Sequence, residues 1–165
     1  MDVARLYQDN YRTLSRYLFR FTGDADRAAD AAQEAFVRLM QQPPRPMENP
    51  RAWLFKVATN LANESSRTAT RRRTLLMKAP GRAPHADPPP TPDEALQSAL
   101  RRGAVQEALL TLSEKERMAL LMREEGFAQK EIAEAVGTTT GSVGTLISRA
   151  LARLAGRLEL DKEDV

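Results

Sequence analysis

Apolar side chains recur at helical spacing through the first third of the chain. One series runs through residues 2–21, a second through 24–41, and a third begins after Pro50. Each repeats every three to four residues, which is the spacing that places side chains on one face of an α-helix. Asp24 and Asp26 open the second series, and acidic residues favour a helix N-terminus. The three apolar faces contain Val3, Leu6, Tyr7, Tyr11, Leu14, Leu18 and Phe21; Ala28, Ala32, Ala35, Phe36 and Leu39; and Trp53, Leu54, Val57, Ala58, Leu61 and Ala62.

The second half of the chain contains the sequence signals that begin and end helices. The segments TPDE at 91–94 and SEKE at 113–116 each place a hydroxyl three residues before a glutamate, which is the pattern of a capping box. Gly126 ends the helix that starts at the second box, and two more helices are predicted over 129–136 and about 140–157. No strand-length run of alternating residues competes with these helices, so the sequence predicts an almost entirely α-helical protein.

The ten prolines divide the chain because they fall in two clusters. Four lie within 43–50 and the other six within 80–92. Proline removes a backbone donor and fixes φ, so both clusters interrupt regular structure. The second cluster is long and poor in large apolar residues, which indicates an extended linker. The predicted organisation is a small helical domain over 1–77 that contains 43–50 as a loop, a Pro-rich linker over 78–92, a second helical domain over 93–158 and an acidic tail over 159–165.

The composition argues against several classes of function. The chain has no cysteine and a single histidine, His85 in the linker, which excludes thiolate and His-rich metal sites. It contains no glycine-rich phosphate loop and no HExxH pattern, so we expect no enzyme activity, no metal and no cofactor. No apolar run approaches the ~20 residues that span a membrane, and the N-terminus lacks a signal-peptide pattern. We therefore expect a cytoplasmic protein without membrane insertion.

The net charge of +3 is unevenly distributed. Residues 1–75 hold 13 Lys/Arg and 8 Asp/Glu, a net of +5, whereas 76–95 and 96–165 each carry a net of −1. A basic first half favours a polyanionic partner, although a modest excess of arginine is also typical of a solvated surface.

Residues 129–148 have the pattern of a helix-turn-helix. Ala133 is small where the two helices would cross, and Gly137 lies where the turn needs a positive φ. The second helix would enter the major groove by its N-terminal turns; the alternative is a helical hairpin in which the glycine only caps a helix. The inner faces would contain Ile132, Val136, Val143 and Leu146. The hydroxyls and arginines that could contact DNA are Thr138, Thr139, Thr140, Ser142, Thr145, Arg149 and Arg153.

Three stretches of the sequence resemble one family in the same order along the chain. Residues 108–154, with LSEKER, an apolar helix, EIAEAVG and GSV, resemble region four of the extracytoplasmic-function (ECF) sigma factors of the sigma-70 family. GDADRAADAAQEAFVRLM at 23–40 resembles the region-two helix that docks on core RNA polymerase, and NPRAWLFKVATNLANESSR at 49–67 resembles the helix that faces the minus-ten promoter element. The resemblance covers about 23–75 and 100–157. It implies an alternative-type sigma factor that binds core RNA polymerase and promoter DNA, initiates transcription of a stress- or signal-responsive regulon, and has an anti-sigma factor as a partner.

The resemblance also implies where the minus-ten element binds. Region two of such sigma factors captures a flipped base in a pocket formed partly by a loop, which here would be 43–50, and prolines would hold this loop at little entropic cost. Trp53 shares a helix face with Val57 and Leu61, so we interpret it as a core anchor rather than a base-stacking platform. The opposite, polar face is expected to contact DNA, although a solvated helix face would have the same pattern. Its residues, with the basic run that follows, are Lys56, Asn60, Asn63, Arg67, Arg71, Arg72 and Arg73.

The polymerase-binding helix needs polar side chains around a modest apolar centre. The segment 30–39 offers both, and without the resemblance it would be interpreted as ordinary helix surface. The residues expected to bind core polymerase are Asp30, Gln33, Glu34, Phe36 and Arg38, with Leu39 nearby.

The chain departs from the family pattern in the second helix of the helix-turn-helix. The family commonly has a basic residue at the position of Gly144 and an arginine at that of Leu146, so contact with the minus-thirty-five element should be weakened here. Glu64 also stands where an aspartate is usual. A rival function is a stand-alone helix-turn-helix regulator, which would explain 129–157 but would leave 23–75 without a role.

Overall fold

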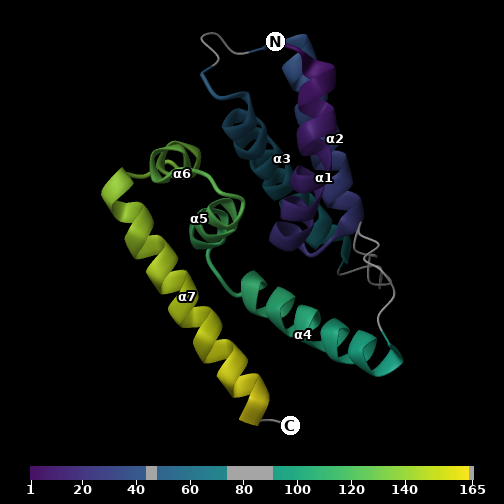
Figure 1. Ribbon diagram of the computed structural model, residues 1–165, viewed down its shortest axis with the longest axis vertical. Coiled ribbons are helices and arrows are strands. Elements are labelled where there is room, and N and C mark those ends of the chain that lie inside the picture. Colours follow the sequence, from purple (N-terminus) through teal and green to yellow (C-terminus); the bar gives the residue numbers. More distant parts are fainter. Residues whose placement is uncertain (44–47, 74–90, 164–165) are drawn as a thin grey trace.

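The protein is described by a computed structural model that covers residues 1–43, 48–73 and 91–163, with the backbone alone for 65–73 and 161–163. Seven helices run through these residues, and no strand occurs among them (Figure 1). The prediction of an all-α fold is therefore confirmed. The helices are α1 (Val3–Thr22), α2 (Ala25–Gln41), α3 (Pro50–Arg73), α4 (Pro92–Leu110), α5 (Glu114–Glu124), α6 (Gln129–Val136) and α7 (Thr140–Glu163).

Short polar signals in the sequence determine where the helices begin. The Asp24 carboxylate accepts hydrogen bonds from the N–H groups of Asp26 and Arg27, the second and third residues of α2, at 3.0 and 3.2 Å. Thr91 and Ser113 cap α4 and α5 in the same way, at 3.4 and 3.2 Å. Gly23 takes a φ of 73°, which glycine adopts without steric cost, and the resulting tight turn leaves α1 and α2 antiparallel.

The first three helices form a bundle around their apolar faces. Tyr17 and Phe55 are almost completely buried between them, and the Tyr17 hydroxyl hydrogen-bonds Thr59 Oγ1 at 3.0 Å. Burial raises the pKa of the Tyr17 hydroxyl above its ordinary value, because the phenolate would lose its hydration. Trp53 is half-buried and packs against this core, as do Val57 and Leu61, so the core interpretation of Trp53 holds in part.

The last four helices contain the helix-turn-helix that the sequence predicts. Gly137 takes a φ of 79°, and its N–H donates to the Ala133 carbonyl at 2.9 Å, which ends α6. Ala133 is buried where α6 packs, and the inner faces of α6 and α7 are closed by Ile132, Val136, Val143 and Ile147. Leu146 is half-buried and packs at the edge of the same core.

The two halves of the chain pack against each other through a continuous apolar core. We call this contact the junction; it comprises Arg51 and Phe55 on α3, Gln106 on α4, Arg117 on α5, and Phe127 between α5 and α6. The rings of Phe55 and Phe127 meet edge to face with centroids 4.8 Å apart, and the Arg51 guanidinium lies 4.2 Å from the Phe127 centroid. In Figure 1, α5 and α6 accordingly lie beside α1 and α3.

The structure extends one predicted element and leaves others undescribed. Helix α7 continues to Glu163, whereas the sequence predicts an end near 157. Half-buried Leu154 and Leu158 lie one helical turn apart, so the packed side of the helix persists past the predicted end. The linker predicted over 78–92 lies outside the described residues except for Thr91 and Pro92, which begin α4. Of the loop predicted over 43–50, residues 44–47 also lie outside them.

Candidate protein and nucleic-acid interfaces

Helix α2 presents a polar face to solvent, as the sequence predicts for a polymerase-binding helix. Asp30, Gln33, Glu34 and Arg38 are all exposed. Arg38 Nε lies 3.3 Å from Glu34 Oε1, an ion pair between residues one helical turn apart. This face can form charged and hydrogen-bonded contacts with a protein partner.

Phe36, which we expected to bind the partner as part of this face, is instead a core residue. Its side chain is only 3% exposed and packs under α1, where its ring centroid lies 5.0 Å from that of Tyr7. Phe36 falls on the buried side of α2 because it is next to Ala35 and one turn from Ala32 and Leu39. It can support the exposed face from beneath, but it cannot touch a partner.

Helix α3 keeps its predicted polar face outside. Lys56 and Asn60 are exposed and Asn63 is half-buried, one helical turn after another. Arg67 and Arg71–Arg73 belong to the last turns of the same helix, but their side chains lie outside the described residues. At the start of α3, the Asn49 side chain caps the helix by accepting from the Ala52 N–H at 3.0 Å.

The predicted DNA-binding side chains of α7 divide into two groups. Thr140, Thr145 and Arg149 are exposed. Thr139 and Ser142 hold the first turn instead: Thr139 Oγ1 accepts from the Ser142 N–H at 3.3 Å and lies 2.8 Å from the Ser142 hydroxyl. Thr138 is half-buried in the turn.

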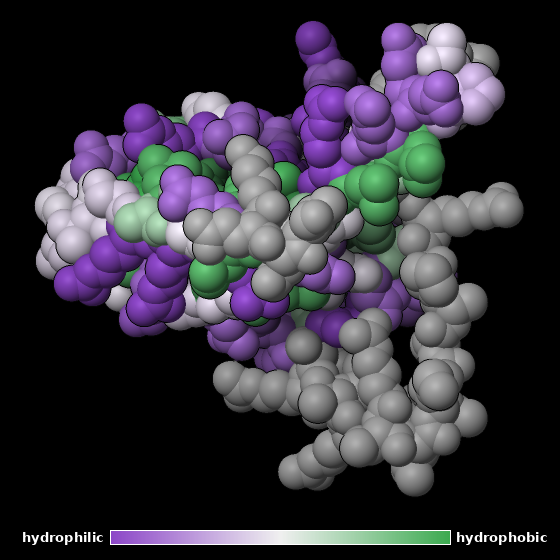
Figure 2. Space-filling view, turned by 90° about the horizontal axis from the view of Figure 1, so that it is seen from below, coloured by the Kyte–Doolittle hydropathy of each residue, from purple (hydrophilic) through white to green (hydrophobic). Residues whose placement is uncertain are grey.

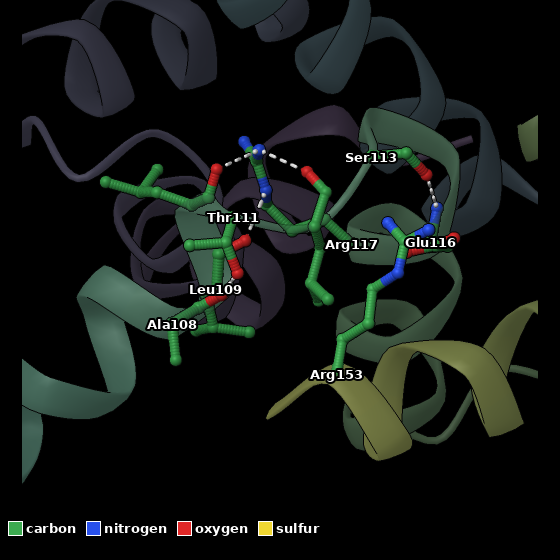
Figure 3. A network of polar contacts seen from close by, with 9 residues as sticks. Ala108, Leu109, Thr111, Ser113, Glu116, Arg117 and Arg153 are labelled. Carbon is green, nitrogen blue, oxygen red and sulfur yellow. Dashed lines mark hydrogen bonds and ion pairs between the residues drawn. The ribbon is translucent and has the colours of Figure 1, made fainter. Parts of the chain in front are cut away.

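Arg153, predicted to contact DNA, forms an ion pair within the protein although its side chain is largely exposed. Its Nη1 lies 3.2 Å from Glu116 Oε2, whose side chain is only 7% exposed (Figure 3). A buried carboxylate is costly unless it is paired, so Arg153 holds α7 against α5. The sequence does not reveal this contact, because the capping pattern of SEKE suggests that Glu116 faces its own helix start, whereas its carboxylate points to α7.

Gly144 and Leu146, the two positions of α7 that depart from the family pattern, have different surroundings. Gly144 is exposed, and a Cβ built there would meet only Gln129 Nε2, at 4.0 Å. Leu146 packs against the apolar core and so has a structural role. The same Gln129 side chain donates to the Thr140 carbonyl at 3.0 Å, which ties the start of α6 to the start of α7.

Sequence reasoning missed the polar contacts of the junction. Arg117 donates to carbonyls of Leu109, Leu110 and Leu112 at 3.0 to 3.3 Å, and its Nη1 donates to the Phe21 carbonyl of α1 at 2.9 Å. Figure 3 shows its guanidinium among these oxygens at the end of α4. Burial lowers the pKa of the Arg117 guanidinium from its ordinary value, because the charge loses water. The sequence contains Arg117 only as one charge in LSEKER, with no sign of its distant acceptor.

Further contacts join the halves, among them an ion pair between Arg16 Nη2 and Glu125 Oε2 at 3.5 Å. Gln106 Nε2 donates to the Arg20 carbonyl at 2.9 Å, and Arg51 Nη2 donates to the Glu125 carbonyl at 2.8 Å. The Asn49 amide donates to the Glu131 carboxylate, which joins the start of α3 to α6 of the helix-turn-helix. These contacts place residues next to the predicted minus-ten loop directly against the predicted DNA-binding domain.

The described residues contain neither a membrane-spanning helix nor a cluster of metal ligands. None of their helices combines the length and the apolar character needed to cross a membrane. No group of three or more His, Cys, Asp or Glu side chains gathers there to hold a metal ion.

Comparison with known proteins identifies both halves. Residues 6–72 match the family described as Sigma-70 region 2, and residues 102–154 match Sigma-70, region 4. The ECF RNA polymerase sigma factor SigL of Mycobacterium tuberculosis is 34% identical over 160 residues, which cover 92% of this chain and 86% of SigL. The RNA polymerase sigma factor YlaC of Bacillus subtilis is 28% identical over 165 residues, which cover 98% of this chain and 91% of YlaC.

Solved structures show the same fold. The sigma factor RpoE of Bartonella quintana, in complex with the anti-sigma factor NepR, superposes with a TM-score of 0.72 at 23% identity, covering 97% of this chain and 98% of RpoE. CnrH, in complex with the cytosolic domain of CnrY, gives a TM-score of 0.71 at 21% identity over 96% of this chain and 88% of CnrH. A stand-alone helix-turn-helix regulator is not favoured, because the first half matches region 2. The chain therefore belongs to the ECF sigma factors of the sigma-70 family, which direct RNA polymerase to promoters and initiate transcription.

Proposed function

We propose that this sigma factor has three binding surfaces: α2 binds core polymerase, α3 binds the minus-ten element and α7 binds the minus-thirty-five element. The observation that carries this proposal is the arrangement of α2 and α3. Their apolar faces are buried in one bundle, while Asp30, Glu34 and Arg38 on α2 and Lys56 and Asn60 on α3 are exposed. One rigid bundle can then hold polymerase and DNA at the same time.

The chemistry of the α3 face suits an opened promoter. An asparagine amide both donates and accepts, so Asn60 and Asn63 can bind the edges of unpaired bases, while Lys56 neutralises a phosphate. Flipping a base out of the duplex costs a few kcal/mol, which contacts to the flipped base would offset. The arginines at 67 and 71–73 extend the basic character along the strand.

The chemistry of α7 suits a weaker DNA contact. Thr140 and Thr145 present hydroxyls at the start of the helix, and Arg149 is the basic side chain that follows them on the exposed side. Such hydroxyls and a single nearby charge can bind phosphates and base edges in the major groove. The Arg153 guanidinium stabilises the position of the helix through Glu116.

The two halves must separate to reach both promoter elements. The elements lie about 25 base pairs apart, or roughly 85 Å at a rise of roughly 3.4 Å per base pair. A compact chain of this length has a radius of gyration of only about 15 Å. We infer that the halves act as two domains, 1–77 and 93–158, and that the junction opens on the promoter. A linker over 78–92, extended at ~3.1 Å per residue, could span on the order of 45 Å.

We also infer an anti-sigma factor as a partner, no enzyme activity and a cytoplasmic location with the polymerase. The anti-sigma proposal is supported by RpoE and CnrH, which share this fold and are bound to anti-sigma factor NepR and to the cytosolic domain of CnrY. Exposed apolar side chains on α4 and α7, including Leu96, Leu100, Leu151 and Leu160, offer a surface for such a partner. Figure 2 views the molecule from below Figure 1, the side on which α4 begins and α7 ends. It shows hydrophobic residues gathered among hydrophilic ones.

The test of the proposed function is run-off transcription with purified core polymerase on DNA upstream of the gene's own operon. We expect specific transcripts only when the protein is added, and permanganate footprinting should detect an open minus-ten region. Asn60→Ala should reduce this opening about tenfold, which is the effect of one lost base contact. If the protein alone binds the duplex tightly and adds no transcript, the stand-alone regulator is correct instead.

A further inference from the structure

The exposed face of the first turns of α7, which we propose as the minus-thirty-five surface, carries no charge. Gly141, Thr145 and Ser148 follow one another at spacings of four and three residues and are all exposed, so they share this face of the helix. The chain has no charged residue between Glu134 and Arg149. The groups that this face offers to a base are therefore backbone, two hydroxyls and the methyl group of Thr145.

Gly141 leaves the start of this face open. A Cβ built there would meet nothing within 4 Å, and the residue lacks the positive φ that Gly137 adopts in the turn. The fold therefore gives no reason for a glycine, which lowers helix stability relative to alanine. A glycine does allow another molecule to approach the backbone closely. The first turns of α7 lie at the outer edge of the molecule, on the side of α6 away from α3, where DNA can reach them (Figure 1).

Gly144 lies at the edge of this face rather than at its centre. A Cβ built there would meet Gln129 Nε2 of α6 at 4.0 Å, so the position faces the first helix of the helix-turn-helix. That helix crosses the DNA backbone in complexes of such motifs, so a side chain at 144 would face phosphates. The contacts to base edges are left to the centre of the face, where Gly141 and Thr145 lie.

The chemistry of this face favours thymine over guanine. Guanine is commonly read by an arginine or lysine that donates two hydrogen bonds to its O6 and N7 atoms, and the face has neither residue. A hydroxyl can donate or accept, so it discriminates little between bases. The C5 methyl of thymine is the apolar group of the major groove, and a threonine methyl is one of its usual partners. Thr145 offers that methyl, one turn after the open backbone of Gly141.

We infer that α7 reads thymine methyl groups of the minus-thirty-five element through the methyl group of Thr145, and that Gly141 permits the close approach this contact needs. The inference rests on the proposed function, in which α7 binds that element, and adds the class of base that it recognises. Arg149, one turn after Thr145, contributes a phosphate contact that selects no base. The minus-thirty-five element of this protein should therefore be rich in A·T pairs.

The experiment uses holoenzyme, assembled from the full-length protein and core polymerase, on the promoter found by run-off transcription. In the minus-thirty-five region each thymine is replaced by deoxyuridine, which lacks the C5 methyl, and each guanine by 7-deazaguanine, which lacks N7. Fluorescence anisotropy of the labelled promoter measures the affinity. At least one deoxyuridine substitution should weaken binding about fourfold, the effect of one lost apolar methyl contact. Every 7-deazaguanine substitution should leave the affinity within about twofold.

Two protein variants test the residues that make the contact. Thr145→Ser removes the methyl and keeps the hydroxyl, so this holoenzyme should bind the thymine and deoxyuridine promoters equally. Gly141→Leu places a large side chain between the helix and the groove and should weaken binding about tenfold, as a mismatched base pair does. Gly156→Leu, also in open space on α7, is the matched control and should stay within about twofold of wild type. Circular dichroism checks that each variant keeps its helical content.

The outcomes separate this inference from the proposed function. If a 7-deazaguanine substitution weakens binding more than any deoxyuridine substitution, α7 reads guanine; the inference is overturned and the α7 surface stands. If the Thr145→Ser holoenzyme keeps the full response to deoxyuridine, the methyl contact is refuted. If no base substitution and no α7 variant changes the affinity, Arg149→Ala included, the proposed role of α7 fails as well.

Discussion

The two halves of the molecule present their candidate binding residues in different ways. On α2 and α3 the polar residues are exposed on faces opposite the core, and the ion pair between Glu34 and Arg38 on the α2 face joins neighbours on the same helix. On α6 and α7 several exposed polar side chains make contacts within the protein: Thr139 caps α7, Gln129 bridges two helices and Arg153 pairs with a buried carboxylate. The candidate binding residues of the first half are thus already exposed, whereas the second half positions a recognition helix that carries little charge of its own. We expect polymerase and minus-ten contacts to dominate the affinity.

Reversing the charge of the α2 face should give the largest effect. We expect the partner surface to be basic, because it would complement Asp30 and Glu34. In the double variant Asp30→Arg, Glu34→Arg, like charges would then face each other, which costs several kcal/mol and should weaken core binding on the order of 100-fold or more. Co-purification with core polymerase should be lost while the circular dichroism spectrum keeps its helical form. Normal holoenzyme assembly by this variant would show that the face is wrongly assigned.

Loss of the Arg117 side chain should give the next largest effect. Arg117 donates to carbonyls from both halves, and Arg117→Ala leaves those acceptors without their charged donor. The free energy of unfolding should fall by about 2–3 kcal/mol, the upper range for hydrogen bonds to a charged group. Arg123→Ala, on the exposed side of the same helix, should change it by less than about 0.5 kcal/mol in the same denaturant titration. An equal effect of the two variants would mean that the junction contributes nothing through Arg117.

Arg149 and Arg153 lie one turn apart on α7, and their replacement by alanine should change different properties: the first DNA binding, the second stability. Arg153→Ala leaves Glu116 buried without its partner and should lower the free energy of unfolding by about 1–2 kcal/mol, a value reduced because Arg153 itself is largely exposed. Arg149→Ala should leave stability unchanged and lower the salt dependence of minus-thirty-five binding by about one phosphate contact. Thermal unfolding and DNA titration at several salt concentrations measure the two effects. If Arg153→Ala changes the salt slope and not the stability, the original DNA assignment of Arg153 is restored.

The smallest effect should come from adding a charge to α7. A side chain at Gly144 meets open space, so Gly144→Lys is tolerated and improves helix propensity by up to about 1 kcal/mol. One new phosphate contact should strengthen minus-thirty-five binding severalfold at low salt, and less at high salt. Gly156→Lys, also in open space but further along α7, is the control. An equal increase in DNA affinity for both variants would indicate a nonspecific effect of charge rather than a recognition helix that contacts DNA through residues 140–149.

Sequence patterns predicted the helices well because their signals are local. Apolar spacing, Asp24, Ser113 and Gly137 each act within a few residues, and the structure confirms the helices that they predicted. The same apolar spacing predicted the exposed polar faces of α2 and α3.

The contacts that the sequence does not reveal are those between residues distant in the sequence. Phe55 lies beside the apolar stripe of its helix and is buried because Phe127 covers it from the other half. Arg117 and Arg153 have the same charge and flexibility as any surface arginine, and only the packing of α5 against α1 and α7 gives them acceptors. The sequence assigns Phe36 to the polymerase-binding set because it lies between the exposed Glu34 and Arg38, whereas its cover, Tyr7, comes from another helix.

The central claim is that a preformed first half binds polymerase and that the junction opens when both promoter elements are bound. Because the chain has no cysteine, Gln42→Cys and Glu134→Cys, both at exposed positions, can carry a fluorescent donor and acceptor on the two halves. In the free protein the halves are in contact, so energy transfer should be efficient. In a promoter complex with core polymerase the two elements lie roughly 85 Å apart, and transfer should fall close to background. Efficient transfer that persists in a transcribing complex would contradict the account.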